Sequence, residues 1–232
     1  MPVHELIKRF PDAVTLRDRS RALAMLDAIV SPEWEDRYYS FDPRWSPGEE
    51  AASMREGSGN VYAVVFSPAG VYVQACDHES PVSAYRTTPP APWPGLLDSV
   101  PEVFRKHLRE PAFADHDGLP RASVCLWREA SDVAWRCGDV QVPEQDRDDA
   151  DGAGWLLGIL CDGTGQAYRS YAEEVHALEI GLGAVAHLYA LRPLTQAVVS
   201  AINPQVRLAD LATDIEQIGY PTTADRAPTT AD

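Results

Sequence analysis

Two apolar stretches around a four-residue turn constrain the fold of this chain more than any other feature. Residues 61–66 (VYAVVF) and 71–76 (VYVQAC) are rich in β-branched and aromatic residues, which favour strands. Between them, Pro68 suits the second position of a type I turn, and Gly70 can adopt the left-handed backbone that follows it. The pattern predicts a β-hairpin. Because both faces of its first strand are mostly apolar, we expect the hairpin to be central and covered on both sides.

The residues before this hairpin predict a short helix, and the residues after it predict a polar turn. The segment SPGE at 46–49 combines a capping serine, a proline suited to the first helical position and a glutamate that can complete a capping box. We therefore expect a helix from Ser46 to about Arg55, ended by Gly57 and Gly59. After the hairpin, the segment DHESP at 77–81 predicts the end of the strand, because proline disfavours helical backbone at the residue before it.

Helices are expected at both ends of the chain. Apolar residues recur at helical spacing over 15–30 and again over 96–109. After the turn at 162–165, four short helices are expected, separated by proline and glycine: 167–178, 183–190, 194–202 and 208–218. Between the helical regions, residues 124–127 and 133–137 predict a second hairpin. The apolar run at 154–161 predicts a buried strand.

The order of these elements predicts the fold class. Strands concentrate between about residues 38 and 161 and are joined by hairpins and loops, so we expect an antiparallel sheet with helices from both chain ends. This is an α+β fold, which we assign to a single domain over residues 1–220. Residues 221–232 contain the segment PTTAD twice and have no apolar anchor, so they predict a disordered tail.

The charge balance argues against nucleic acid as a partner. The chain has 20 Lys and Arg against 35 Asp and Glu, a formal net charge of −15 and a pI of about 4.7. Phosphate binding depends on clusters of Lys and Arg, so we expect no nucleic-acid partner. There is no apolar run of membrane-spanning length and no signal-peptide pattern, so we expect no membrane association and a cytoplasmic location.

The cysteine pattern argues against a metal or redox site. The four cysteines are scattered and form no C-x-x-C pair, so zinc and thioredoxin-like sites are not indicated, and we expect no metal and no cofactor. If the second hairpin turns about Ser131, Cys125 lies opposite Cys137 and Trp127 lies opposite Trp135. A cross-strand disulfide would fit this register, but a reducing cytosol disfavours it.

The polar turn at 77–79 is the strongest candidate for a small-molecule site. Two carboxylates beside an imidazole, Asp77, His78 and Glu79, could hold a metal or act as acid and base. Strand alternation opposes this interpretation, because consecutive side chains point to opposite faces; a structural turn network is the default interpretation. Cationic and aromatic groups upstream complete this candidate pocket: Arg44, Trp45 and Arg55.

An acidic loop at 141–151 is the candidate partner-binding segment. It carries five carboxylates against the single cation Arg147. The acidic residues are Glu144, Asp146, Asp148, Asp149 and Asp151. We expect them to steer a basic protein partner electrostatically before Trp and Tyr anchors are buried.

Other motifs indicate structure rather than chemistry. The segment DHDG at 115–118 lacks the spacing of a calcium loop and predicts an Asx turn. There is no G-x-S-x-G motif, and the segment DGTG at 162–165 lacks the Lys-Ser/Thr pair of a P-loop. We therefore assign no catalytic residue.

Two blocks of the sequence resemble a bacterial group of uncharacterised proteins. The first is FDPRWSPGEEAASMREGSGNVYAVVFSPAGVYVQACDHESPVSAY, with its W-x-x-GE, SMR-x-G-x-G and HE-S features. The second is LRPLTQAVVSAINPQVRLADLATDIEQIGYP, near the C-terminus. The resemblance implies no activity. In general type, an acidic cytosolic α+β protein of this size is similar to the immunity proteins that neutralise bacterial toxins.

Three hypotheses about function follow. The leading one is a soluble, non-enzymatic acidic protein that binds another protein, for example a basic toxin that it neutralises. The first alternative is a small-molecule binder or hydrolase-like enzyme with its pocket near Arg55, Asp77, His78 and Glu79. The second alternative is a structural or regulatory subunit, which an apolar patch on the terminal helices would favour. The oligomeric state does not follow from the sequence.

Overall fold

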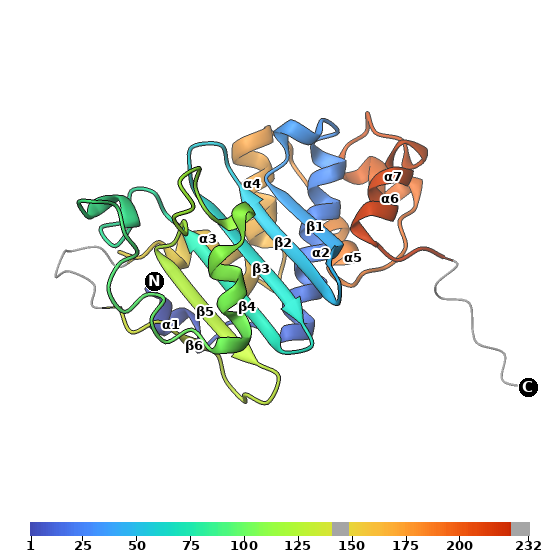
Figure 1. The fold of residues 1–232 in the computed structure, drawn as a ribbon. Helices are drawn as coiled ribbons and strands as arrows, with labels where there is room; N and C mark the ends of the chain where they lie inside the picture. The colour runs from blue at the N-terminus through green and yellow to red at the C-terminus, as the bar shows by residue number, and fades with distance from the viewer. Residues whose placement is uncertain (141–148, 224–232) are drawn as a thin grey trace, which may run out of the picture. The chain divides into compact units, whose positions relative to one another are not determined.

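The computed structural model describes residues 1–140 and 149–223, and they form an α+β fold (Figure 1). The chain divides into two compact units. The sheet unit contains residues 1–13 and 44–161, and the helical unit contains residues 14–43 and 162–232. The predicted tail, apart from residues 221–223, lies outside the described residues.

The sheet unit is built on an antiparallel sheet whose strands follow one another in chain order. The order is β1-β2-β3-β4-β5-β6. The strands are β1 (Tyr39–Ser46), β2 (Glu49–Arg55), β3 (Val61–Ser67), β4 (Gly70–Cys76), β5 (Val124–Glu129) and β6 (Arg136–Cys137). The boundary between the two units falls within β1, after residue 43. The predicted antiparallel sheet, with helices from both chain ends, is therefore confirmed.

The central hairpin forms where the sequence predicts it. Val64 pairs with Val73, and Ser67 pairs with Gly70 next to the turn. Gly70 has a φ of 129°, and a Cβ at this position would lie 2.1 Å from the backbone oxygen of Arg128 on β5. A side chain at residue 70 would therefore separate β4 from β5, so the glycine is required by the close approach of the two strands.

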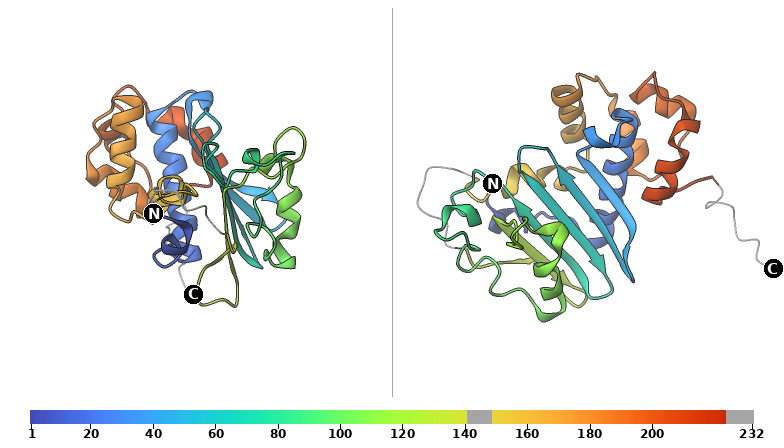
Figure 2. Two further views of the ribbon diagram at one scale, coloured as in Figure 1. Left: turned by 90° about the vertical axis from the view of Figure 1, so that its left-hand side faces the viewer. Right: turned by 45° about the horizontal axis from the view of Figure 1, so that its top comes forward.

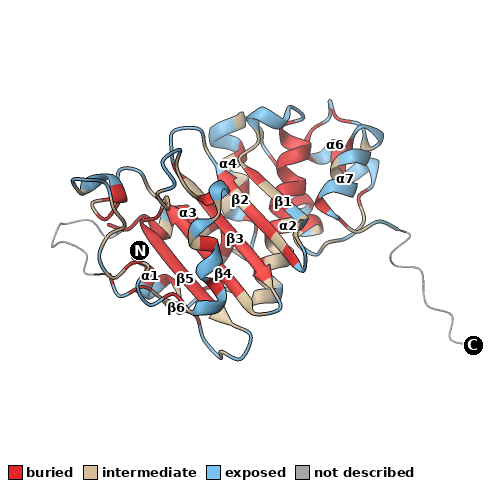
Figure 3. Ribbon diagram, viewed as in Figure 1, coloured by how far each residue is buried: buried red, intermediate tan, exposed pale blue. Residues whose placement is uncertain are grey.

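Both faces of the sheet are covered within the sheet unit. On one face, the 3₁₀ helix η3 (Glu102–Arg109) packs Phe104 against Tyr72 and Trp127 in a buried cluster. On the other face lie α1 (Val3–Leu6) and α3 (Ala153–Cys161), and α3 contacts β3 and β4 (Figure 2). Figure 3 shows that the middle strands are buried along most of their length. Two shorter 3₁₀ helices are η2 (Ala84–Arg86) and η4 (Pro111–Phe113).

The helix predicted over 46–55 is wrong, because these residues form the end of β1, a tight turn and β2. Ser46 and Glu49 do contact each other, because the Ser46 hydroxyl donates to the Glu49 carboxylate at 2.6 Å. This bond joins two side chains and is not the side-chain-to-backbone pair of a capping box. However, Gly48 adopts a φ of 78° between them, which reverses the chain instead of starting a helix. Pairing of β2 with β3, with Ala52 opposite Val64, then overrides the helical propensity of EEAASM.

Three other predictions of secondary structure are corrected. The apolar run at 154–161 is the helix α3 rather than a buried strand, because a short apolar run fits a buried helix equally well. Residues 96–99 form turns and residues 100–101 are irregular, so the helix predicted from residue 96 begins only at 102, as a 3₁₀ helix. The second hairpin pairs Leu126 with Cys137 and Trp127 with Arg136, one residue away from the predicted register. All four cysteines are free.

The helical unit contains five α-helices and two short 3₁₀ helices among its described residues. They are α2 (Ala13–Val30), η1 (Trp34–Asp36), α4 (Gln166–His176), α5 (Leu182–Tyr189), α6 (Gln196–Ile202), η5 (Leu208–Leu211) and α7 (Ala212–Ile218). Ala13, the first residue of α2, belongs to the sheet unit. Over the ranges the structure describes, none of the helices has the length and apolar character needed to span a membrane.

A buried carboxylate organises the helical unit. Asp27 of α2 is fully buried, and it accepts hydrogen bonds from the backbone N–H groups of Tyr38 (2.6 Å) and Tyr39 (3.0 Å). Its other oxygen accepts the hydroxyl of Tyr168 on α4 at 3.1 Å. Burial raises the pKa of Asp27 although these donors oppose the shift. One carboxylate thus fixes α2, the start of β1 and α4 together.

Candidate functional site

The structure brings together two segments that the sequence marks as separate candidates. The turn after β4 and the acidic segment before α3 are joined by hydrogen bonds within the sheet unit. The Ser80 hydroxyl donates to the backbone oxygen of Ala150 at 2.8 Å. The Ser123 hydroxyl donates to the backbone oxygen of Asp151 at 2.8 Å and accepts the backbone N–H of Asp77 at 2.9 Å. Ser80 in the turn and Ser123 just before β5 therefore both link the two segments.

An exposed tryptophan lies at this junction. The side chain of Trp155, in the first turn of α3, is 50% exposed, and its indole N–H donates to Asp77 Oδ2 at 3.3 Å. The other oxygen of Asp77 accepts the backbone N–H of Glu79 at 2.9 Å. Gly152 allows this approach, because a Cβ there would lie 2.5 Å from the Asp77 Cβ. The indole of Trp155 is therefore held at the surface beside the 77–79 turn.

Asp149 fixes the start of α3. Its carboxylate accepts the backbone N–H groups of Gly154 and Trp155, both at 2.8 Å, and lies 3.3 Å from the amino group of Met1. A carboxylate at this position satisfies free helix donors and interacts favourably with the helix dipole. We call the surface formed by Asp77, Glu79, Asp149 and Trp155 the Trp155 face.

Asp151 lies behind this surface rather than on it. Its side chain is buried and accepts the backbone N–H groups of Val3 (2.8 Å) and Ala153 (3.0 Å). Burial raises the pKa of this carboxyl, although both donors oppose the shift. Asp151 thus ties α1 to α3. The remaining predicted partner-binding residues, Glu144, Asp146 and Asp148, lie outside the described residues.

His78 turns toward a neighbouring loop rather than toward Asp77. Its Nδ1 lies 2.9 Å from Asn60 Oδ1, and its backbone N–H donates to the same oxygen at 3.0 Å. Because that oxygen is an acceptor, we assign the proton to Nδ1. Asn60 in turn donates to Glu56 at 2.6 Å. Glu79 is exposed.

The upstream residues of the predicted pocket lie elsewhere. Trp45 stacks on Phe113 with ring centroids 5.8 Å apart and joins a cluster with Ala63 and Val65. By alternation this is the face covered by η3, whereas Asp77 contacts α3 on the opposite face. Arg44 and Arg55 are exposed near the ends of β1 and β2. The structure therefore does not gather the six residues around one point.

A polar cluster that the sequence analysis missed lies under η3. Glu49 is buried, its Oε1 lies 2.7 Å from Lys106 Nζ and 3.5 Å from His107 Nε2, and its other oxygen accepts the Ser46 hydroxyl. Tyr72 stacks on the His107 ring at 5.4 Å. The only available signal was the Ser-Glu pair, which fits a capping box equally well; the lysine and histidine are more than 50 residues away in sequence.

The pKa shifts of Glu49 and His107 favour a carboxylate beside a neutral imidazole. Burial would raise the pKa of Glu49, but hydrogen bonds from Lys106 and Ser46 and the charge of Lys106 outweigh it, so the pKa is lowered. Burial lowers the pKa of His107 more than the attraction of Glu49 raises it. The cluster is thereby able to hold η3 against the turn between β1 and β2.

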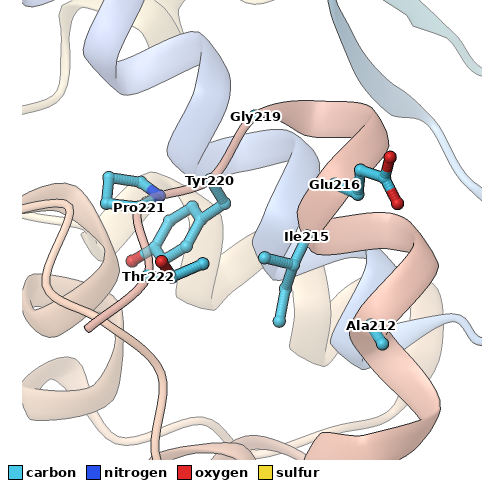
Figure 4. Close-up of a pocket in the computed structure, with 7 residues that line it drawn as sticks. All are labelled: Ala212, Ile215, Glu216, Gly219, Tyr220, Pro221 and Thr222. Atoms are coloured by element: carbon cyan, nitrogen blue, oxygen red, sulfur yellow. The ribbon is translucent and has the colours of Figure 1, made fainter. Parts of the chain in front are cut away.

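Two further features of the described residues are an Asx turn and a hollow. Asp115 accepts the backbone N–H groups of Asp117 and Leu119, both at 2.9 Å, which confirms the predicted Asx turn; ligand atoms of Asp115, His116 and Asp117 lie within 4.8 Å of one another. In the helical unit, a hollow of about 610 Å³ lies beside α7 (Figure 4). Its lining is mostly apolar: Ala212, Ile215, Glu216, Gly219, Tyr220, Pro221 and Thr222.

Comparison of the chain with protein-family models, with curated proteins and with solved structures found no match.

Proposed function

We propose that this chain is an acidic protein that binds another protein, and that a basic surface of the partner docks on the Trp155 face. The observation that carries the proposal is the meeting of the 77–79 turn with the 149–151 segment around a half-exposed indole. Aromatic anchors surrounded by polar groups are typical of the residues that contribute most to protein–protein affinity.

The geometry of the anchor supports this function. The backbone of Trp155 is fixed by Asp149, and its indole N–H is held by Asp77. A side chain that is already ordered loses little conformational entropy on binding, so more of the contact energy is available as affinity. An indole also offers a large apolar surface together with a polar edge.

The charge of the chain supports a basic partner. The net charge of −15 produces a field that accelerates encounter with cationic surfaces and disfavours anionic ones. Asp77, Glu79 and Asp149 contribute to this field close to the indole. A basic toxin neutralised by this protein would be one such partner.

The test is a binding measurement with purified protein variants. Partners are captured on the immobilised wild-type chain, identified, and remeasured one at a time by isothermal titration calorimetry at low and high salt. We expect Trp155→Ala to weaken binding of the true partner by at least tenfold, about 1.4 kcal/mol. Glu79→Gln should reduce the association rate and make binding less dependent on salt concentration. It should change the dissociation rate less.

Two controls separate the anchor from general charge effects. Trp155→Phe keeps an aromatic ring but removes the hydrogen bond to Asp77, so its affinity should lie between those of wild type and Trp155→Ala. Glu102→Gln removes one exposed negative charge on η3, which covers the opposite face of the sheet. A partner whose affinity is unchanged by Trp155→Ala, or reduced equally by Glu102→Gln and Glu79→Gln, would contradict docking on the Trp155 face.

A further inference from the structure

A second exposed tryptophan lies in the helical unit, on the short helix between α2 and β1. Trp34 is 58% exposed, which is unusual for so large an apolar side chain. Three acidic residues surround it in sequence, Glu33, Glu35 and Asp36, and all three are exposed. We call these four residues the Trp34 surface.

The loop that carries Trp34 is held rigidly by Arg37. The guanidinium of Arg37 donates to the backbone oxygens of Ser31 (2.8 Å) and Pro32 (2.7 Å) and pairs with Asp214 on α7. Its backbone N–H donates to the oxygen of Trp34 at 3.2 Å, which closes the 3₁₀ turn. Both ends of the turn are therefore fixed, and the indole is displayed on a pre-organised element.

The Trp34 ring already contacts one guanidinium. The Cζ of Arg37 lies 5.9 Å from the ring centroid, within the range of a cation–π interaction. This cation is committed to Asp214, whereas the carboxylates at positions 33, 35 and 36 lie on the solvent side of the loop. The local surface therefore presents an aromatic plane together with excess negative charge.

We propose that the Trp34 surface binds an arginine-bearing segment of another protein, with the guanidinium stacked on the exposed part of the indole. The flanking carboxylates would pair with the same arginine or with a neighbouring one. Arginine is favoured over lysine because its planar guanidinium stacks on aromatic rings and is less strongly hydrated. Phosphate-bearing partners are disfavoured because three carboxylates would repel them.

This surface is independent of the proposed Trp155 face. The two tryptophans belong to different units of the chain, and neither argument uses a contact of the other. An experiment that reports on each indole separately can therefore test one surface without assuming the other.

The test uses the indole N–H signals of the full chain in two-dimensional ¹H–¹⁵N NMR. The Trp34 and Trp155 signals are assigned from their loss in Trp34→Phe and Trp155→Phe. The probe is a capped pentapeptide, Gly-Arg-Ala-Arg-Gly, and its matched version has lysine in place of arginine. We expect the Trp34 signal to shift saturably, with the arginine peptide binding about two- to fivefold more tightly than the lysine peptide.

The charge contribution is tested with a matched pair of double variants. Glu33→Gln/Glu35→Gln should weaken binding of the arginine peptide by about two- to tenfold. The control Glu5→Gln/Glu179→Gln removes the same charge from two exposed sites on α1 and beyond α4, and should change the affinity by less than twofold. Circular dichroism of both double variants confirms that they are folded.

Three results would overturn the proposal. One is a Trp34 signal that stays unchanged while the Trp155 signal shifts, which would leave the proposed function intact. The second is equal affinity for the arginine and lysine peptides. The third is an equal loss of affinity in the two double variants, which would mean that net charge alone attracts the peptide.

Discussion

Removing the buried carboxylate of Glu49 should loosen η3 from the sheet. The change is Glu49→Gln, which keeps the size of the side chain and one acceptor oxygen but removes the charge. The carboxylate lies 2.7 Å from Lys106 and 3.5 Å from His107, and it accepts the Ser46 hydroxyl. Hydrogen bonds that involve a charged group contribute about 1.5–3 kcal/mol each when they are buried.

The expected cost is set by how exposed the partners are. The Lys106 side chain is 62% exposed, so its pairing with Glu49 is screened by water and contributes about 0.5 kcal/mol. The contacts to Ser46 and to buried His107 are shielded and carry most of the effect. We therefore expect Glu49→Gln to reduce the free energy of unfolding by about 2 kcal/mol, and Lys106→Met by less than about 1 kcal/mol.

The measurement is urea unfolding at pH 7 together with native-state amide hydrogen exchange of residues 102–109. The pKa shifts of Glu49 and His107 both predict that stability falls as the pH is lowered. The lowered pKa of Glu49 gives stability that is present above the pKa of the unfolded chain and is lost as the pH falls through the native value. The lowered pKa of His107 likewise gives stability that is lost as the pH falls below the unfolded value.

Wild-type protein should therefore lose stability as the pH falls below about 6.5, through His107, and further as it falls below about 4.3, through Glu49. Glu49→Gln should lack the second loss, whereas the first should remain. Unchanged exchange rates in η3 after Glu49→Gln would refute the reasoning, because they would show that the cluster does not hold this helix. A cost for Lys106→Met equal to that of Glu49→Gln would also contradict it.

Three further predictions concern the sheet unit. Gly70→Ala should reduce the free energy of unfolding by about 3 kcal/mol, since its Cβ would meet the backbone of β5; urea unfolding that matches wild type would show that the strands can separate at little cost. Asp151→Asn can accept only one of its two backbone donors, so it should cost about 1–3 kcal/mol and speed exchange of the Val3 amide; unchanged exchange there would count against the tie between α1 and α3. Burial raises the pKa of Cys125 to about 12 and that of Cys137 to about 11, so iodoacetamide at pH 7 should label both slowly in the native chain and rapidly in urea; fast native labelling of Cys125 would contradict its burial.

Turn residues and strand-forming residues predicted correctly those elements whose contacts lie close together in sequence. The β3–β4 hairpin is an example, because its turn residues and both strands lie within 16 residues of one another. The Ser46–Glu49 pair shows the limit of such signals. The two residues do interact, but through their side chains in a turn between strands, because Gly48 reverses the chain and β2 pairs with β3. Similarly, the register of β5 and β6 depends on how the intervening loop closes, which residue types alone did not determine.

The candidate site was predictable only in pieces. The 77–79 turn and the 149–151 segment were both recognised from their carboxylates, but they are about 70 residues apart in sequence. Their junction depends on single hydroxyl groups, those of Ser80 and Ser123, whose distant partners residue types alone do not reveal. Trp155 was likewise assigned to a buried strand, and its exposure became apparent only because that segment is a helix.

The chain order of the sheet has a consequence for how the sheet unit folds. Each strand pairs with its neighbours in sequence, so most strand pairs can form with low contact order. The exception among the strand pairs is β4 with β5, which closes a loop of nearly fifty residues. The hydrogen bond from Val3 to Asp151, which joins α1 to α3, spans 148 residues. Loop closure of this length carries a large entropic cost. The β2–β3–β4 meander can therefore form early, while docking of α1 onto α3 completes folding last.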